Sequence, residues 1–315
     1  MGLASTRRMG VATQSVKGLH KPNLEYRPNT YPVPANASLP RMFCVALFVG
    51  SRGSGKAYSC CQLLKMYETH GIKNLKGKTM KQRIILISPT SAANPVFTCL
   101  KHMDMSRDLV ENYSDAKLVE VLDDIRQEKE ATDDFKVKRK LWHKFKRCKH
   151  PEEELQYEEL MQLHAGGFQP PKPPRYPDGV VNFLVLDDLV GSSAFKATGR
   201  SALTNLCLKN RHLQINIMIC TQNLKAIPKA IRLNTSLFVV FRFASEKVIC
   251  EDLYEEVSNS LKLHQFCELY EFATKDDHDA LIMDFSQPKE MRFKMNWHTV
   301  ISLHGGQSVP LSPLR

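Results

Sequence analysis

A glycine-rich turn near residue 50 has the spacing of a phosphate-binding loop. Three of the four fixed positions of the P-loop pattern, Gly-x4-Gly-Lys, occur in Gly50-Ser51-Arg52-Gly53-Ser54-Gly55-Lys56-Ala57. The glycines let backbone N–H groups converge on phosphate oxygens, and the lysine ammonium reaches the β- and γ-phosphates. The sequence therefore predicts that residues 50–57 bind ATP and that Lys56 also serves in catalysis. The alternative is a glycine turn between a strand and a helix that binds no ligand.

The residue after Lys56 breaks the pattern. A Ser or Thr hydroxyl normally binds Mg²⁺ at this position, and the methyl group of Ala57 cannot coordinate a metal. Three explanations are open: an extra water takes the place, a nearby hydroxyl such as that of Ser54 or Ser59 substitutes, or hydrolysis is impaired. We therefore expect ATP and Mg²⁺ as cofactors, whereas the rate of hydrolysis stays open.

Two adjacent carboxylates follow an apolar run of strand length. The run at 183–186 is followed directly by Asp187 and Asp188. A strand that ends in Asp places a carboxylate beside the phosphates, where Asp187 would hold Mg²⁺ through water. Asp188 is then in place to polarise the attacking water as general base. The alternative for Asp188 is a cap on the following turn.

A glutamine and two arginines complete the catalytic candidates. The apolar run 215–220 leads into Gln222, and ligands bind at the carboxyl edge of the strands in open α/β sheets. Gln222 is therefore the candidate sensor of the γ-phosphate, with a strand-end turn as the alternative. Arg211 and Arg232 each precede a strand. Oligomeric ATPases place an arginine of one subunit against the γ-phosphate of its neighbour, and either residue could do this; a surface contact is the alternative for each.

A parallel sheet would bring these residues together. Five unbroken apolar runs have the length of strands covered on both faces, at 42–49, 83–88, 181–186, 215–220 and 237–243. Helices are predicted at 57–70, 200–209, 225–233 and about 245–265, and a terminal hairpin at 280–285 with 291–297. This alternation predicts an α/β fold with a mostly parallel sheet and helices on both faces.

The order of the apolar runs indicates the class of α/β fold. The run 83–88 lies along the chain between the strand that precedes Gly50 and the strand that precedes Asp187. The sheet therefore has room for an additional strand between these two, as in the additional-strand class of P-loop NTPases. We place this domain at residues 42–303, followed by a C-terminal tail at 304–315.

A charged helical insertion is predicted at about 104–179. Apolar residues recur there at helical spacing among Asp, Glu, Lys and Arg, for example at Leu118, Leu122 and Ile125. Within 136–149 the charge is mostly positive, and the proline-rich stretch 170–174 closes the region as a stiff connector. A solvated helical face explains such charges by default, and contact with DNA is the more specific alternative.

Positive charge is also concentrated at the N-terminus. The 315-residue chain has a net charge of +11, and residues 1–41 hold six Lys and Arg against Glu25 alone. Residues 1–40 are rich in Pro, Asn and Ser and show no apolar period, so we expect a disordered arm. A basic N-terminal tail suits a polyanion such as nucleic acid, and many solvated tails look the same. Gly2 lies in an N-myristoylation pattern, which would give a membrane contact.

The composition argues against several classes of protein. No stretch approaches the roughly 20 apolar residues that a membrane span requires, and the N-terminus lacks the apolar core of a secretory signal. The nine cysteines form no Cys-x-x-Cys pair, and several lie inside apolar runs. We therefore expect reduced, mostly buried thiols in an intracellular protein, without a disulfide framework or zinc site.

Taken in order, the motifs resemble those of the genome-packaging ATPases of large nucleocytoplasmic DNA viruses and their polinton-like relatives, a branch of the FtsK–HerA group. The set is Gly50–Lys56, Leu184–Asp188, Asn210-Arg211-His212, Thr221-Gln222 and Arg232-Leu233-Asn234. The order from Arg-His through Gln to Arg-x-Asn is the more specific part, and the resemblance covers about 42–300. Ala57 departs from the family pattern.

The resemblance implies a RecA-like motor that assembles as a homo-oligomeric ring and drives double-stranded DNA into a capsid. It also implies capsid or portal-like viral proteins as partners, and the host cytoplasm (viral factory) or the virion as location. Two alternatives are a cellular or plasmid-borne DNA translocase of the same superfamily, and a degenerate P-loop protein that binds ATP as an assembly scaffold with little hydrolysis. A small-molecule kinase is disfavoured because Gln222 would lack a role and no arginine-rich lid is evident.

Overall fold

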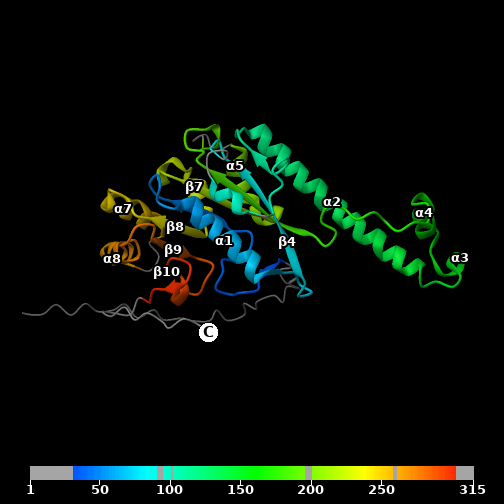
Figure 1. The fold of residues 1–315 in the computed structure, drawn as a ribbon. Helices are drawn as coiled ribbons and strands as arrows, with labels where there is room; N and C mark the ends of the chain where they lie inside the picture. The colour runs from blue at the N-terminus through cyan, green and yellow to red at the C-terminus, as the bar shows by residue number, and fades with distance from the viewer. Residues whose placement is uncertain (1–30, 91–94, 101, 196–200, 258–260, 303–315) are drawn as a thin grey trace, which may run out of the picture. The chain divides into compact units, whose positions relative to one another are not determined.

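The computed structural model describes residues 31–90, 95–100, 102–195, 201–257 and 261–302. At their centre lies a sheet of eleven strands (Figure 1). In spatial order the strands are β1 (Val33–Pro34), β3 (Ile72–Lys73), β4 (Thr79–Ile87), β6 (Val180–Asp187), β7 (Ile215–Thr221), β2 (Val45–Val49), β8 (Leu237–Phe241), β9 (Ala280–Asp284), β10 (Phe293–Met295) and β11 (Thr299–Val300). The eleventh strand, β5 (Leu109–Val110), pairs with β4 outside this order.

Five neighbouring strands form a parallel core. The pairs β4–β6, β6–β7, β7–β2 and β2–β8 are all parallel, and β9 and β10 continue the sheet in antiparallel fashion. Every residue of β2, β7 and β8 is buried, which is why these segments appear in the sequence as unbroken apolar runs. The parallel strands and the terminal hairpin, formed by β9 and β10, are confirmed, whereas the sheet as a whole is mixed, because β1, β3 and β11 also pair in antiparallel fashion.

The strand between the P-loop strand and the acidic strand is β7. Its residues pair with β2 on one side and with β6, which ends in Asp187, on the other. β4, which contains the run 83–88, lies on the far side of β6. The additional-strand class is therefore confirmed, but the sequence order indicated the wrong candidate for the intervening strand. Order along the chain does not fix order in a sheet, because a helical crossover can place the next strand on either side.

Helices cover both faces of the sheet. Along β2 the odd-numbered residues belong to one hydrophobic cluster and the even-numbered residues to another, since neighbouring strand residues point to opposite faces. The first cluster includes residues of α5 (Ala202–Leu213) and α8 (Leu263–Ala273), and the second includes residues of α1 (Lys56–His70). The remaining α-helices are α2 (Asp115–Phe145), α3 (Pro151–Glu154), α4 (Tyr157–Ala165), α6 (Lys229–Asn234) and α7 (Glu246–Val257).

The predicted helix at 245–265 is in fact two helices. α7 ends at Val257, and α8 begins at Leu263 and runs on to Ala273. Leu261 and Lys262, which precede α8, are not helical, and Lys262 has an extended backbone. The start of α8 is marked by Gln265, whose side-chain oxygen accepts a hydrogen bond from the Lys262 backbone N–H at 3.0 Å.

The helical insertion consists mainly of one long helix. α2 has 31 residues, which corresponds to about 46 Å of helix. Its first turns pack on the main core through Leu118 and Ile125, and its last turns form a separate small cluster that includes Leu141 and Leu163. Figure 1 shows α2 extending beyond the sheet and carrying α3 and α4 at its far end.

An ion-pair network fixes the base of α2 to the sheet. The side chain of Arg83, on β4, is 2% exposed, and its guanidinium lies 2.6 Å from Asp108, 2.6 Å from Asp124 and 2.8 Å from Glu128. Two further arginines pair with these carboxylates, Arg107 and Arg175. Because buried charges are costly unless they are paired, each member holds the others in place. The first half of α2 is therefore held firmly against β4.

Part of the predicted N-terminal arm belongs to the fold. Val33 and Pro34 form β1, which pairs with β3, and the Tyr67 hydroxyl donates to the Pro40 carbonyl at 2.8 Å. This corrects the assignment of residues 31–41 to the arm; the isolated sequence shows no apolar period there because only short contacts hold it. Residues 1–30, with Gly2, and the predicted tail at 304–315 lie outside the described residues.

The cysteines and the helices agree with the sequence analysis. All nine cysteines are described, none is in a disulfide, and six are buried. Among the helices in the described ranges, none combines the length and the apolar composition that crossing a membrane would need.

Candidate nucleotide-binding site

The loop at 50–55 joins β2 directly to α1, as a P-loop requires. Gly55 forms the N-terminal cap of α1 with φ 101°, a conformation that residues with a Cβ rarely adopt. At Gly50 a Cβ would lie 2.4 Å from the Ser54 Oγ and 2.8 Å from the Phe241 Cβ. The first and last glycines of the motif are therefore required by the backbone path and by close packing.

Lys56, the first residue of α1, folds back over this loop. Its ammonium donates to the carbonyl oxygens of Gly50 at 2.9 Å and Ser51 at 2.7 Å. Burial lowers the pKa of Lys56, and the negative charges of Asp187 and Asp188 counteract part of this effect. The ammonium is thus held near the N-terminus of α1, where a bound phosphate would contact it.

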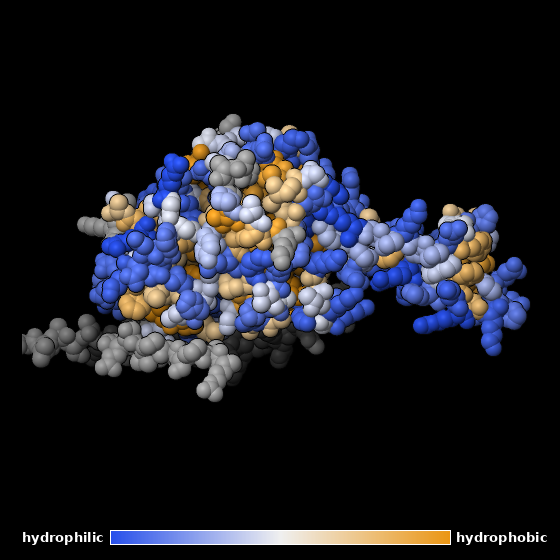
Figure 2. All heavy atoms as spheres, viewed as in Figure 1, coloured by the Kyte–Doolittle hydropathy of each residue, from blue (hydrophilic) through white to orange (hydrophobic). Residues whose placement is uncertain are grey.

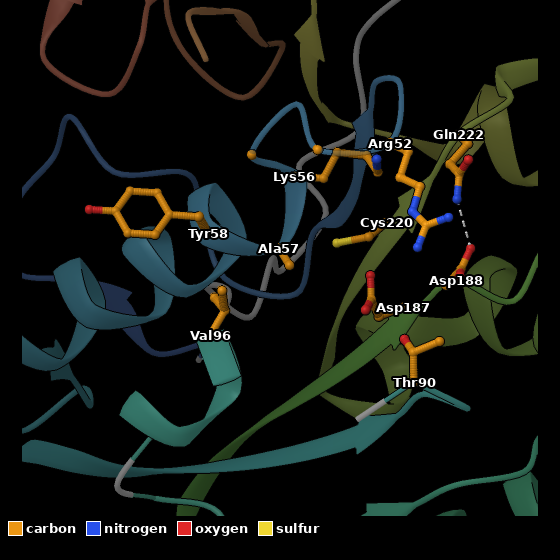
Figure 3. A pocket seen from close by; sticks show the side chains of 12 residues that line it. Arg52, Lys56, Ala57, Tyr58, Thr90, Val96, Asp187, Asp188, Cys220 and Gln222 are labelled. Carbon is orange, nitrogen blue, oxygen red and sulfur yellow. Dashed lines mark hydrogen bonds between the residues drawn. The ribbon is translucent and has the colours of Figure 1, made fainter. Parts of the chain in front are cut away.

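A pocket of about 620 Å³ joins the loop to the carboxyl ends of β6 and β7 (Figure 3). It contains Lys56, the carboxylate pair and Gln222, which lie far apart in the sequence. The lining residues are Arg52, Gly53, Gly55, Lys56, Ala57, Tyr58, Thr90, Val96, Asp187, Asp188, Cys220 and Gln222. The predicted members Gly50, Ser51 and Ser54 shape the loop but do not line this pocket.

Asp187 is the buried member of the carboxylate pair. It is the last residue of β6 and is 7% exposed. Burial raises the pKa of Asp187, the neighbouring charge of Asp188 raises it further, and Lys56 and a hydrogen bond from Ser88 lower it in part. A carboxylate in this setting gains from a cation, as expected of a residue that would hold Mg²⁺.

Asp188 and Gln222 contact each other across two strands. The Gln222 Nε2 donates to the Asp188 Oδ1 at 3.1 Å, drawn as a dashed line in Figure 3. They meet because β6 and β7 are parallel neighbours, so the residues that follow them emerge at the same edge. Asp188 has φ 53°, which turns the chain sharply after the strand. Its carboxylate is thus paired with the proposed sensor.

Neither hydroxyl proposed to replace the one missing at Ala57 lines the pocket. The Ser59 Oγ accepts a hydrogen bond from the Trp297 Nε1 at 3.0 Å, and Ser59 is 6% exposed. The Ser54 Oγ is packed against Gly50. Both side chains point from the loop and the helix into packed surroundings, so neither hydroxyl faces the pocket in this structure.

Thr90 is a hydroxyl that the sequence analysis missed. It lines the pocket, and its Oγ1 lies 3.2 Å from the Ser88 Oγ. Ser88 also forms the hydrogen bond with Asp187 mentioned above. The available signal was its position just after the apolar run 83–88, at the carboxyl end of a strand.

Arg232 is occupied inside its own chain. Its Nε lies 2.8 Å from a carboxylate oxygen of Glu256, and a second guanidinium nitrogen donates to the Ile227 carbonyl at 3.2 Å. Only 13% of its side chain is exposed. It does not line the pocket of its own chain, and a role at the γ-phosphate of a neighbouring subunit stays a prediction.

Arg211 lies at the opposite edge of the sheet from the pocket. It occupies the last turn of α5, just before β7 begins, and is exposed. The pocket is at the carboxyl ends of the parallel strands, whereas a residue before a strand lies at their amino ends. Arg211 therefore does not reach the pocket of its own chain, and contact with a second chain stays a prediction.

Arg52 is the arginine that does line the pocket. Figure 3 shows its side chain extending from the loop toward the carboxylate pair and Gln222. The sequence analysis included Arg52 only as one of the loop residues. The presence of an arginine inside the P-loop motif could have indicated a second positive charge beside the phosphates.

Neither a protein-family model nor a curated protein sequence matches this chain. Similar solved structures include the DNA-packaging ATPase B204 of Sulfolobus turreted icosahedral virus, at 15% identity, covering 81% of this chain and 97% of that one, with a TM-score of 0.41. B204 of Sulfolobus turreted icosahedral virus 2 in complex with ATP-gammaS matches at 14% identity over 80% of this chain and 96% of that one, with a TM-score of 0.40.

EssC of Geobacillus thermodenitrificans, ATPases 2 and 3, is 16% identical over 82% of this chain and 44% of that one, with a TM-score of 0.42. At TM-scores this low the similarity carries no argument about function. The assignment to RecA-like, additional-strand P-loop proteins rests on the strand order and on the loop between β2 and α1.

Proposed function

We propose that this chain binds ATP with Mg²⁺ in the pocket and hydrolyses the nucleotide to move double-stranded DNA. The observation that supports it most is the convergence of three strand ends on one pocket. Lys56 comes from the loop after β2, the carboxylate pair from the end of β6, and Gln222 from the end of β7. These are the parts that ATP hydrolysis requires: phosphate binding, metal binding, a base and a sensor.

The residues around the loop suit a nucleotide with Mg²⁺. Lys56 and the N-terminus of α1 present positive charge to the β- and γ-phosphates. Asp187 and the Thr90 hydroxyl offer the oxygen ligands that Mg²⁺ prefers, directly or through water. When bound, the ion would neutralise phosphate charge in the transition state. Such a donor set leaves no need for a hydroxyl at position 57.

Asp188 is the general base in this proposal. A water attacks the γ-phosphorus, the bond from that phosphorus to the β–γ bridging oxygen breaks, and the Asp188 carboxylate accepts a proton from the water. The Gln222 amide orients this carboxylate through the 3.1 Å hydrogen bond. The same amide can exchange Asp188 for a γ-phosphate oxygen, and this exchange would report the state of the nucleotide to β7.

Arg52 supplies a second cation to the phosphates within one chain. Lys56 is fixed over the loop, whereas Arg52 is exposed and extends toward the carboxylate pair. A guanidinium in that position stabilises the charge on the γ-phosphoryl group as the bridging bond breaks. This role does not require an arginine from a neighbouring subunit.

The proposed motor is a genome-packaging ATPase. Support comes from the order of motifs in the sequence, from Arg211-His212 through Gln222 to Arg232-x-Asn234. On this proposal the chain forms a homo-oligomeric ring, acts on double-stranded DNA in the host cytoplasm or virion, and meets capsid or portal-like proteins. Acylation of Gly2 would add a membrane contact.

Steady-state ATP turnover with and without duplex DNA tests the proposal. A motor should hydrolyse ATP faster when duplex is present. Turnover that ignores DNA would contradict the motor. Packaging is separated from other translocation by adding the capsid proteins of the same virus, which should bind the motor.

The strongest competing function is an ATP-binding scaffold with little hydrolysis. Ala57 favours it, because the usual metal-binding hydroxyl is missing. A scaffold would bind ATP tightly and show no turnover in either condition.

A further inference from the structure

We propose that the far half of α2 and the turn that follows it form a second binding site, for the phosphate backbone of duplex DNA. We call residues 135–150 the basic arm. The choice of duplex DNA as the ligand rests on the proposed function; the site itself rests on charge, exposure and spacing. It lies on the helical insertion and shares no residue with the ATP pocket.

Charge along the insertion changes sign at residue 135. Residues 115–134 contain eight Asp and Glu against three Lys and Arg, a net charge of −5. Residues 135–150 contain eight Lys and Arg and no Asp or Glu, a net charge of +8. A helix dipole favours basic residues only in the last turn, so it does not account for positive charge over the whole arm.

The acids of the first half have structural partners. Asp124 and Glu128 belong to the network around Arg83, which fixes α2 to β4. Negative charge in this half therefore serves the fold. No comparable buried acid faces the arm among the described residues, because the arm lies beyond the sheet and its ion pairs are with exposed or half-buried acids.

Several positive charges of the arm have no acidic partner in the described chain. Lys136, Lys138 and Lys144 pair with Asp133, Asp134 and Glu159. Within the described residues, no ion pair is formed by four exposed cations of the arm, Lys140, Lys146, Arg147 and Lys149. These four charges are free to contact a ligand.

Part of the arm lies on one face of the helix. Lys136, Lys140 and His143 of α2 are spaced by four and three residues, which is one side of an α-helix, and all three are exposed. The buried Phe135 and Leu141 lie on the other side. This face extends for about 10 Å and is followed by the exposed Lys146, Arg147 and Lys149 of the turn after α2, a span along which duplex DNA presents several phosphates.

Phosphate is the ligand chemistry that this surface fits. The free groups are ammonium and guanidinium ions on long side chains, which bind phosphate oxygens without reading sequence. Figure 2 shows hydrophilic residues along α2 between the sheet and its tip, and an apolar patch at the tip. Two exposed side chains of α4, Tyr157 and Met161, would suit a protein partner, which is the competing outcome of the test.

The test compares two full-length variants that lose the same charge. The arm variant is K140Q/K146Q/R147Q/K149Q, and the control is K76Q/K209Q/K275Q/K289Q, whose lysines are exposed and scattered over other elements. Binding of a fluorescein-labelled duplex of mixed sequence is measured by anisotropy between about 50 and 200 mM salt. ATP affinity of both variants is measured as a check that the pocket is folded.

The arm variant should lose steepness in its salt dependence. Each lost phosphate contact reduces the slope of log Kd against log salt by about 0.9, so the slope should fall by about 3 to 4. The control should change by less than about 1. The charge-retaining variant K140R/K146R/R147K/K149R should bind like the unmodified protein.

Three results would overturn the inference. Equal slopes in the arm variant and the control would show that only net charge matters. Normal duplex binding by the arm variant, with loss of capsid-protein binding, would assign the arm to a protein. Absence of duplex binding by the unmodified chain would remove the site, and the proposed motor with it only if ATP turnover also ignores DNA.

Discussion

The proposed ATP pocket and the basic arm both contain lysine and arginine side chains, but these differ in burial and in their hydrogen-bond partners. Lys56 is half-buried, is held by two carbonyl oxygens, and has a lowered pKa because of burial. Lys140 and Lys146 are exposed and, among the described residues, have no ion-pair partner. A charge in the pocket therefore acts on the nucleotide from one fixed position. Each charge of the arm would instead contribute a similar, salt-dependent part of the affinity for DNA. Substitutions should follow this division, with large, specific effects in the pocket and small, additive ones on the arm.

Lys56→Ala should have the largest effect of the substitutions in the pocket. It removes the one lysine that faces the phosphates, so ATP affinity or turnover should fall by at least about 100-fold. Titration calorimetry with ATP and a steady-state assay measure both. The control is Lys65→Ala on the same helix, where an ion pair with Glu68 is lost and little should change. Equal ATP binding by the two variants would remove the central claim.

Asp188→Asn should separate binding from hydrolysis. The amide keeps the size of the carboxylate but cannot accept the proton, so turnover should fall by about 10² to 10⁴ while ATP stays bound. Retention of labelled ATP on the protein measures the trapped state. Asp123→Asn, at an exposed site on α2, is the matched control. Loss of ATP binding in Asp188→Asn would mean that the two carboxylates have exchanged roles.

Arg52→Gln tests whether an exposed cation can still act in the pocket. Turnover should fall by about tenfold with a smaller change in ATP affinity, because the charge acts mainly on the breaking bond. Arg52→Lys should recover part of the loss. Wild-type kcat in Arg52→Gln would place the residue with the arm lysines, as a surface charge.

Ala57→Thr tests whether the loop is adapted to its missing hydroxyl. Asp187 and Thr90 already provide oxygen ligands, so we expect no gain in turnover and at most a few-fold change in the Mg²⁺ requirement. Turnover is measured across Mg²⁺ concentrations. A rise at limiting Mg²⁺ would show that the protein lacks a metal ligand that threonine restores.

The smallest effect concerns stability and pH. Because burial raises the pKa of Asp187 above its usual 3.8, the folded protein binds a proton more readily than the unfolded chain, and stability is lost as pH rises through the folded value. Asp187→Asn removes this cost. Without nucleotide its stability advantage should be absent below pH 3.8 and grow as pH rises, as urea unfolding at several pH values would measure. A pH-independent difference would contradict the assignment of the cost to ionised Asp187.

Much of the parallel core could be predicted, because its strands are covered on both faces. Every residue of β2 and β7 is buried, so apolar runs mark them directly. β1 and β3 were missed because two-residue strands carry no periodic signal. The place of β7 between β2 and β6 was not predictable either, since it depends on which side of the preceding strand each helical crossover places the next strand.

The site residues were predictable where a sequence motif fixes their position at the end of a strand. Lys56, the carboxylate pair and Gln222 meet as expected because each directly follows the carboxyl end of a parallel strand or its loop. The ion pair of Arg232 with Glu256 was not predictable, because the two residues are distant in sequence and become neighbours only on folding. Thr90 was missed because a single hydroxyl after a strand has no distinctive spacing.

The anchored base of α2 gives the insertion a mechanical property. Beyond Thr132, whose hydroxyl donates to the Tyr176 carbonyl at 2.8 Å, the helix runs on to Phe145, which corresponds to about 20 Å of helix. A rotation of about 10° at this point would move the tip by about 3 to 4 Å, or roughly one base-pair rise of 3.4 Å. A small tilt of the helix would therefore displace its tip by a distance comparable to one base-pair step.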